Sequence, residues 1–162
     1  MRANRVPKRD NKSGTAVSTI DNGLRLFVYK FLIRTGRVPL IAEMAKSMSC
    51  SEKKVRVALG RLSESHAFMM QKDGELWRAA PFSAIPTAFP VRIGKRSYWG
   101  NCIWDALGIP AMLKKDADIA ASCSCCNLQM PLQVRHGKLL QRAGVIHIAV
   151  PARDWYKDVV FT

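Results

Sequence analysis

A chain of 162 residues with a hydrophobic fraction of 48% is long and apolar enough to form one globular domain, or two small domains that share a core. No apolar run reaches the length of a membrane span, and residues 1–5 lack the apolar segment of a secretory signal, so we expect a cytoplasmic protein without membrane contact. The five cysteines, an odd number with three crowded together, do not match a secreted disulfide framework and indicate reduced thiols.

The net charge of +14 is typical of a nucleic-acid-binding protein, because Lys and Arg neutralise phosphates. Its distribution weakens that interpretation. Part of the excess lies in residues 1–18, a polar segment without hydrophobic periodicity that we expect to be a disordered tail. The remainder is spread along the chain, so nucleic acid is not the expected partner.

Three helices are predicted in the first half of the chain. Apolar residues at helical spacing follow Asp21, which is expected to be the N-cap of the first helix, and Gly36 is its stop signal. A short second helix is expected over residues 41–48. Ser49 and Glu52 have the spacing of a capping box that opens a third helix. An Asp-Gly turn at Asp73 then predicts a β-hairpin over residues 68–77. The sequence therefore predicts a three-helix winged-helix-like domain over residues 19–80.

A second, α+β domain is expected over residues 91–162, after an extended proline-rich linker at 81–90. Its predicted strands cover residues 91–93, 118–121, 131–135 and 145–150, with turns at 94–95 and 136–137. A helix that carries Cys102 and Asp105 is expected to end at Gly108 and Pro110. The fold class is therefore α+β, with the winged-helix-like domain followed by a small mixed sheet and its helix.

Cys102 and Asp105 are the residues that suggest chemistry. Their spacing places both on one face of a helix, within an apolar stretch. A thiolate is a ligand for soft metals, and a carboxyl group in apolar surroundings keeps its proton to a higher pH. The structural alternatives are a buried cysteine that packs as a small hydrophobe, and an aspartate that caps a helix or lies at the surface.

Four segments around this pair resemble the alkylmercury lyase (organomercurial lyase) family. They are Pro-Thr-Ala-Phe-Pro at 86–90, Tyr-Trp at 98–99, Cys-Ile-Trp-Asp-Ala-Leu at 102–107 and Ile-Pro-Ala-Met-Leu at 109–113. The resemblance extends from the first predicted helix to the end of the chain. In that family the N-terminal domain covers the active site and does not bind DNA. The resemblance implies the same role for the N-terminal domain here.

The resemblance also implies a reaction, protonolysis of a carbon–mercury bond. Cys102 matches the cysteine that captures a small organomercurial substrate, and Asp105 matches the aspartate that delivers a proton to the leaving carbon. The products are a hydrocarbon and thiol-bound Hg(II), which passes to external thiols or to a mercuric reductase. No organic cofactor is implied.

The family has a second catalytic cysteine after the strand that corresponds to residues 145–150, and the chain has none there. The expected thiol falls at or near the position after Thr162, so this chain resembles a form truncated at its C-terminus. A gene boundary is one explanation, and a UGA codon for selenocysteine that is read as a stop is another.

Cys123, Cys125 and Cys126 form a separate group of thiols. By resemblance, Cys125 matches a structural, noncatalytic cysteine of the family. The group is also a candidate set of soft-metal ligands, which relays mercury or replaces the missing thiol if it approaches Cys102. A zinc site with His136 as fourth ligand is the third interpretation.

Two other functions stay open at the level of sequence. One is a soft-metal-responsive DNA-binding regulator that reads DNA with the basic residues of the third helix and senses metal with its cysteines. Those basic residues are Lys53, Lys54, Arg56 and Arg61. The other is a family member that binds metal without catalysis.

Overall fold

The computed structural model describes residues 19–123, 125–141, 143–146, 148 and 150–155, so the predicted tail at 1–18 lies outside the described residues. Helices α1 (Thr19–Thr35), α2 (Ile41–Ser47) and α3 (Glu52–Glu64) come first. They surround a core of Leu24, Val28, Met44 and Leu59, whose side chains are fully buried. The helical spacing of apolar residues therefore predicted these three elements correctly.

Asp21 has a different role from the predicted N-cap. It lies inside the first turn of α1, is buried, and accepts hydrogen bonds from Nε and Nη2 of Arg61 on α3 at 2.9 and 2.6 Å. A buried carboxylate requires such a partner, because the loss of its hydration shell costs about several kcal/mol of free energy. The aspartate ties α1 to α3 instead of capping its own helix.

The predicted capping box at 49–52 is also wrong. Ser49 has a φ of 51°, in the left-handed region, so the chain is still turning there. The N-cap of α3 is Ser51, whose hydroxyl accepts from the backbone N–H of Lys54 at 3.4 Å. The carboxylate half of a capping box is found at α2 instead, where the side chain of Glu43 accepts a hydrogen bond from the N–H of Leu40 at 2.8 Å.

The predicted hairpin is present and carries a third strand. Strands β1 (Met69–Met70), β2 (Leu76–Ala79) and β3 (Phe82–Ser83) form an antiparallel sheet in that order. The turn between β1 and β2 contains Gly74 at a φ of 84°, a conformation that favours glycine. Strand β3 lies in the segment that was expected to be only an extended linker. These elements are compatible with a winged helix, which stays a prediction.

The second sheet is antiparallel throughout, which corrects the expected mixed sheet. Its strands are β4 (Pro90–Ile93), β5 (Arg96–Trp99), β6 (Ala117–Ser122), β7 (Gln129–Arg135) and β8 (Lys138–Leu139), in the order β5-β4-β6-β7-β8. Two of the four neighbouring pairs, β4 with β5 and β7 with β8, are joined by two-residue turns, which only antiparallel strands allow. Strand β5 was not predicted, because its charged and polar residues do not form an apolar run.

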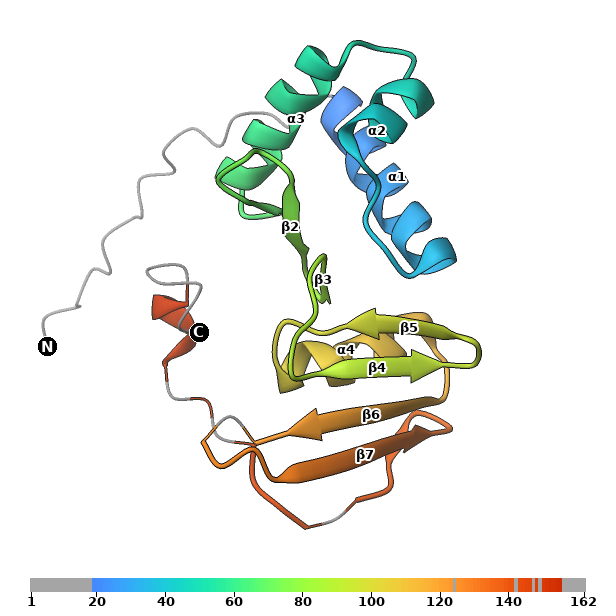
Figure 1. Cartoon of the computed structure of the whole chain (residues 1–162), viewed down its shortest axis with the longest axis vertical. Helices are drawn as coiled ribbons and strands as arrows, with labels where there is room; N and C mark the ends of the chain where they lie inside the picture. The colour runs from blue at the N-terminus through green and yellow to red at the C-terminus, as the bar shows by residue number, and fades with distance from the viewer. Residues whose placement is uncertain (1–18, 124, 142, 147, 149, 156–162) are drawn as a thin grey trace, which may run out of the picture.

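Helix α4 (Ile103–Leu113) packs on one face of this sheet, against β4 and β6 (Figure 1). It continues through Gly108 and Pro110, where the sequence predicted its end. Proline removes one helical hydrogen bond, but Ile109 and Pro110 are buried against the sheet, and that packing outweighs the loss. The helix ends at Lys114, which has a left-handed φ of 51°.

The predicted strand at 145–150 is absent from the described residues of that segment, which are irregular. Val145 is 88% exposed. An apolar run forms a strand only when a neighbouring strand pairs with it, and in the described part of the chain β8 is the last strand of the sheet. A short 3-10 helix at Ala152–Asp154 follows.

The helices and the second sheet share one continuous hydrophobic core. Phe82 of β3 forms an isolated bridge with Gly100, and its ring lies 5.5 Å from that of Tyr98 on β5. The Tyr98 hydroxyl in turn donates to the carbonyl of Ile33 on α1 at 2.8 Å. Figure 1 shows β3 leading from the helical part to the second sheet. The predicted α+β class is confirmed, and no described helix is long and apolar enough to span a membrane.

Candidate functional site

Cys102 and Asp105 lie together where α4 begins. Cys102 is the N-cap residue, with an extended φ of −146°, and Asp105 belongs to the first helical turn. The thiol therefore precedes the helix instead of sharing a helical face with the carboxylate. Both residues are half-buried, so they keep some contact with solvent while part of their hydration is lost.

Gly100 sets the position of this helix start. A Cβ atom on Gly100 would lie 2.7 Å from the backbone nitrogen of Ala106 and 2.9 Å from its Cα, closer than real contacts permit. The carbonyl of Gly100 accepts from the Thr87 hydroxyl at 2.6 Å, and its N–H donates to Phe89 at 3.0 Å. The absent side chain lets the chain pass directly against α4 before it reaches Cys102.

Burial raises the pKa of Asp105. Two neighbours oppose this rise: Nδ2 of Asn101 donates to the carboxylate at 2.8 Å, and the guanidinium of Arg78 favours the charged form. Oδ1 of the same Asn101 is buried without a hydrogen-bond partner among the described residues. Asp105 therefore keeps its proton to a higher pH than an exposed aspartate does.

Burial also raises the pKa of the Cys102 thiol, and the Asp105 charge raises it further. The backbone amides of Asp105 and Trp104 and the charge of Arg78 act in the opposite direction. The start of a helix stabilises a nearby negative charge. The amides at the start of α4 therefore favour the sulfur in its thiolate form when a soft cation binds it in place of the proton.

Arg78 is a residue of this site that sequence reasoning missed. It comes from β2, its guanidinium lies 4.1 Å from the centroid of the Trp77 ring, and burial lowers its pKa while the charges of Asp105 and Cys102 raise it. Tyr29 of α1 also feels the Asp105 charge. The helical part of the chain therefore borders Cys102 and Asp105, while its covering of an active site, which the resemblance implies, stays a prediction. No motif marks these residues, because only the tertiary fold brings them close.

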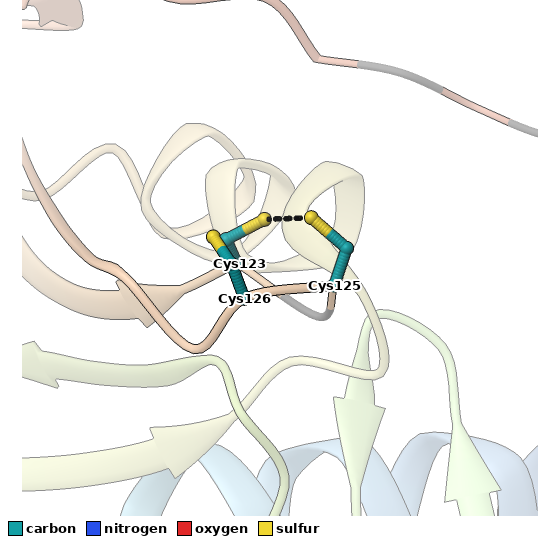
Figure 2. A group of neighbouring side chains, drawn as sticks. All are labelled: Cys123, Cys125 and Cys126. Carbon is teal, nitrogen blue, oxygen red and sulfur yellow. Dashed lines mark hydrogen bonds between the residues drawn. The ribbon is translucent and has the colours of Figure 1, made fainter.

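The second thiol group lies in the loop that joins β6 to β7. The Sγ atoms of Cys123, Cys125 and Cys126 lie within 4.8 Å of one another, and those of Cys123 and Cys125 are 3.1 Å apart (Figure 2). A hydrogen bond from Cys125 lowers the pKa of Cys123 to about 7, and the same contact raises the pKa of Cys125 to about 11. The structure thus brings these three predicted metal ligands together.

Two of the predicted additions to this cluster are not observed among the described residues. Cys102 does not belong to the group of mutually close sulfurs. His136 follows β7 at its far end, and the strand between them, residues 129–135, spans roughly 20 Å at about 3.3 Å per residue. The zinc site completed by His136 is therefore wrong, because the ligand lies at the other end of the hairpin.

The basic face of α3 is partly engaged within the protein. Arg61 is bound to Asp21, and Arg56 lies 4.0 Å from Glu52 on the same helix. Both contacts reduce the positive charge that this helix offers to DNA phosphates.

Comparison with protein families gives a match to the alkylmercury lyase model over residues 82–162, half of the chain. The chain belongs to the alkylmercury lyase family. The match includes β3, the Gly100 turn, Cys102, Asp105 and the three-cysteine loop of this family member.

The mercury-bound form of MerB2 is a similar solved structure, with a TM-score of 0.58 and 21% sequence identity. The alignment covers 78% of this alkylmercury lyase family member and 66% of that chain, slightly under two thirds of its length. At this identity the similarity supports the fold. A search of curated proteins found no match.

Proposed function

We propose that this chain cleaves the carbon–mercury bond of small organomercurials by protonolysis. The observation that carries the proposal is the pairing of a half-buried thiol with a half-buried carboxyl group at one helix start, in a member of the alkylmercury lyase family. A mercury cation is soft and binds thiolate sulfur in preference to oxygen and nitrogen.

In the first step, the sulfur of Cys102 binds the mercury atom of R–Hg⁺ and releases its proton to solvent. Formation of the sulfur–mercury bond removes the thiolate charge, which offsets the unfavourable burial of that charge. The amides at the start of α4 stabilise the sulfur while the proton leaves.

In the second step, Asp105 delivers its proton to the carbon atom bound to mercury. The electron pair of the carbon–mercury bond becomes the new carbon–hydrogen bond, so the hydrocarbon leaves and Hg(II) stays on sulfur with no change of oxidation state. Burial keeps Asp105 protonated to a higher pH, and the Asn101 hydrogen bond and the Arg78 charge stabilise the carboxylate that forms.

External thiols take Hg(II) away by ligand exchange, and a mercuric reductase is a suitable later acceptor. All five cysteines are free in the structure, which fits a protein of the reducing cytoplasm. No organic cofactor takes part in this mechanism.

Hydrocarbon release tests the proposal. The protein is incubated with phenylmercury and excess thiol, and benzene is measured by gas chromatography. We expect release by the unaltered chain and by Cys50→Ser, a control at a half-buried cysteine packed against the helical core. Cys102→Ser should abolish it. Mercury binding without benzene from the unaltered chain would instead indicate a family member that only binds metal.

A further inference from the structure

The loop between β6 and β7 carries three thiols and none of them takes part in the proposed cleavage. Figure 2 shows their sulfurs on the same side of the loop, with Cys123 and Cys125 in contact. Cys125 and Cys126 are exposed and Cys123 is half-buried. A structural thiol is normally enclosed by apolar groups, whereas these sulfurs are open to solvent and to ligand exchange.

The loop is held by its own backbone. The N–H of Cys123 donates to the carbonyl of Leu128, and the N–H of Asn127 donates to the carbonyl of Cys123, both at 2.8 Å. Asn127 has a φ of 55°, which turns the chain back toward β7. The three thiols are therefore gathered by the fold of the hairpin before any metal binds.

The spacing of the sulfurs suits one large, soft cation. Metal–sulfur bonds of about 2.3 Å place three symmetric sulfur ligands roughly 4 Å apart. The observed group, with all sulfurs within 4.8 Å of one another, reaches that arrangement with small side-chain movements. Among the described residues no His, Asp or Glu joins the group, so it offers three ligands where structural zinc takes four.

The loop also leaves the second sheet at the end of β6 that lies beside the segment leading to α4. At the end of β6, the N–H of Ser122 donates a hydrogen bond to the carbonyl of Ala88 at 3.4 Å. The carbonyl of the adjacent Phe89 accepts a hydrogen bond from the N–H of Gly100 at 3.0 Å. Cys123 follows the first of these contacts and Cys102 follows the second. The chain segments that lead to the two thiol groups therefore both start beside the same pair of adjacent residues, Ala88 and Phe89.

We propose that Cys123, Cys125 and Cys126 form a three-thiolate site for Hg(II), which receives the cation from Cys102 after cleavage. The source of the cation rests on the proposed function, whereas binding at the loop does not. Transfer is a ligand exchange: three sulfur–mercury bonds to the loop form and the bond to Cys102 breaks. Of the three protons that the loop thiols lose, one restores the Cys102 thiol and two pass to solvent. No group is oxidised or reduced.

Binding is tested on the full chain under reducing conditions with inorganic Hg²⁺ as the probe, in the presence of glutathione as competitor. The Cys50→Ser/Cys102→Ser variant leaves only the loop thiols. We expect it to bind one Hg²⁺ with the ultraviolet charge-transfer absorption and ¹⁹⁹Hg shift of three sulfur ligands. Replacing any one loop cysteine with serine should weaken binding roughly tenfold or more. A two-sulfur signature, an unchanged affinity in the loop variants, or equal affinity for Zn²⁺ would overturn the site.

Transfer is tested by protection of thiols from alkylation after turnover of phenylmercury without external thiol. Tryptic cleavage separates residues 116–135, which hold the loop cysteines, from residues 97–114, which hold Cys102. We expect benzene release, protected loop thiols and an alkylated Cys102. Benzene release with an unprotected loop would overturn the transfer alone. An absence of benzene, with the loop still protected by added Hg²⁺, would overturn the proposed function and leave the binding site intact.

Discussion

Asp105 and Cys102 illustrate how a few neighbours adjust chemistry at a single residue. Burial raises the pKa of both groups, so each is neutral over a wider pH range than when exposed. That state suits a thiol that exchanges its proton for mercury and a carboxyl group that donates one. Asn101 and Arg78 act against burial at Asp105, and so limit how strongly the proton is held.

Replacing Asn101 with alanine should move the activity of the site to higher pH. The Asn101 hydrogen bond lowers the pKa of Asp105, so its loss raises that pKa and keeps the proton donor protonated further into the alkaline range. The measurement is the alkaline limb of the pH profile of benzene release. Asn22→Ala, at an exposed position of α1, is the control and should leave the limb in place. A limb that moves to lower pH in Asn101→Ala would contradict the assigned role.

The sequence was sufficient to identify Cys102 and Asp105, because the motif that contains them is local. Arg78 and Tyr29 could not be found in this way, since β2 and α1 reach the site only through tertiary packing. The same limit explains Asp21, whose position before a helical apolar pattern indicated an N-cap while its partner Arg61 lies on another helix.

At the scale of elements, short sequence motifs predicted the structure correctly where backbone conformation determines it, as in turns. The Asp-Gly turn located the first hairpin, and glycine and a left-handed residue close the turn at 136–137. The predictions failed where packing decides: α4 continues through Pro110 because that residue is buried, and residues 145–150 are apolar without a described pairing partner. Apolar composition alone does not state which neighbour will cover a segment.

The approach of Gly100 to α4 predicts a difference between two glycine substitutions. Gly100→Ala places a Cβ atom against the backbone of Ala106, which cannot move without displacing the helix start, so we expect destabilisation by roughly 1–3 kcal/mol and loss of benzene release. Gly60→Ala, inside α3 with no atom within 4 Å of the added Cβ, should instead stabilise by up to about 1 kcal/mol. Thermal denaturation followed by circular dichroism measures both. Equal melting temperatures for the two variants would contradict the proposed close packing.

At the scale of the whole molecule, the helical part and the second sheet are joined by a continuous core instead of a flexible linker. The segment expected to be a linker contains β3, whose Phe82 packs against Tyr98. This continuity keeps Arg78 beside Cys102 and Asp105, and therefore makes the helical part a component of the site.

Unfolding should consequently occur in one transition. Tyr98→Phe removes the hydrogen bond to the Ile33 carbonyl, so we expect it to lower stability by about 1 kcal/mol while a single cooperative transition persists. Circular dichroism reports the helices, and tryptophan fluorescence reports all four tryptophans, of which Trp99 and Trp104 lie near the site. Separate melting transitions of the unaltered chain by these two probes would show that its parts unfold independently, in conflict with a shared core.

The division of labour between Cys102 and Asp105 is tested most directly by measuring bound phenylmercury and released benzene in the same sample of Asp105→Asn. Mass spectrometry of the tryptic peptides 97–114 and 116–135 measures the first at Cys102 and at the loop cysteines separately, and gas chromatography measures the second. Because the thiol is unchanged and only the proton donor is lost, phenylmercury should stay bound at Cys102 while benzene release falls by roughly 10²-fold or more, as for loss of a general acid. Benzene release at the rate of the unaltered chain would contradict the account.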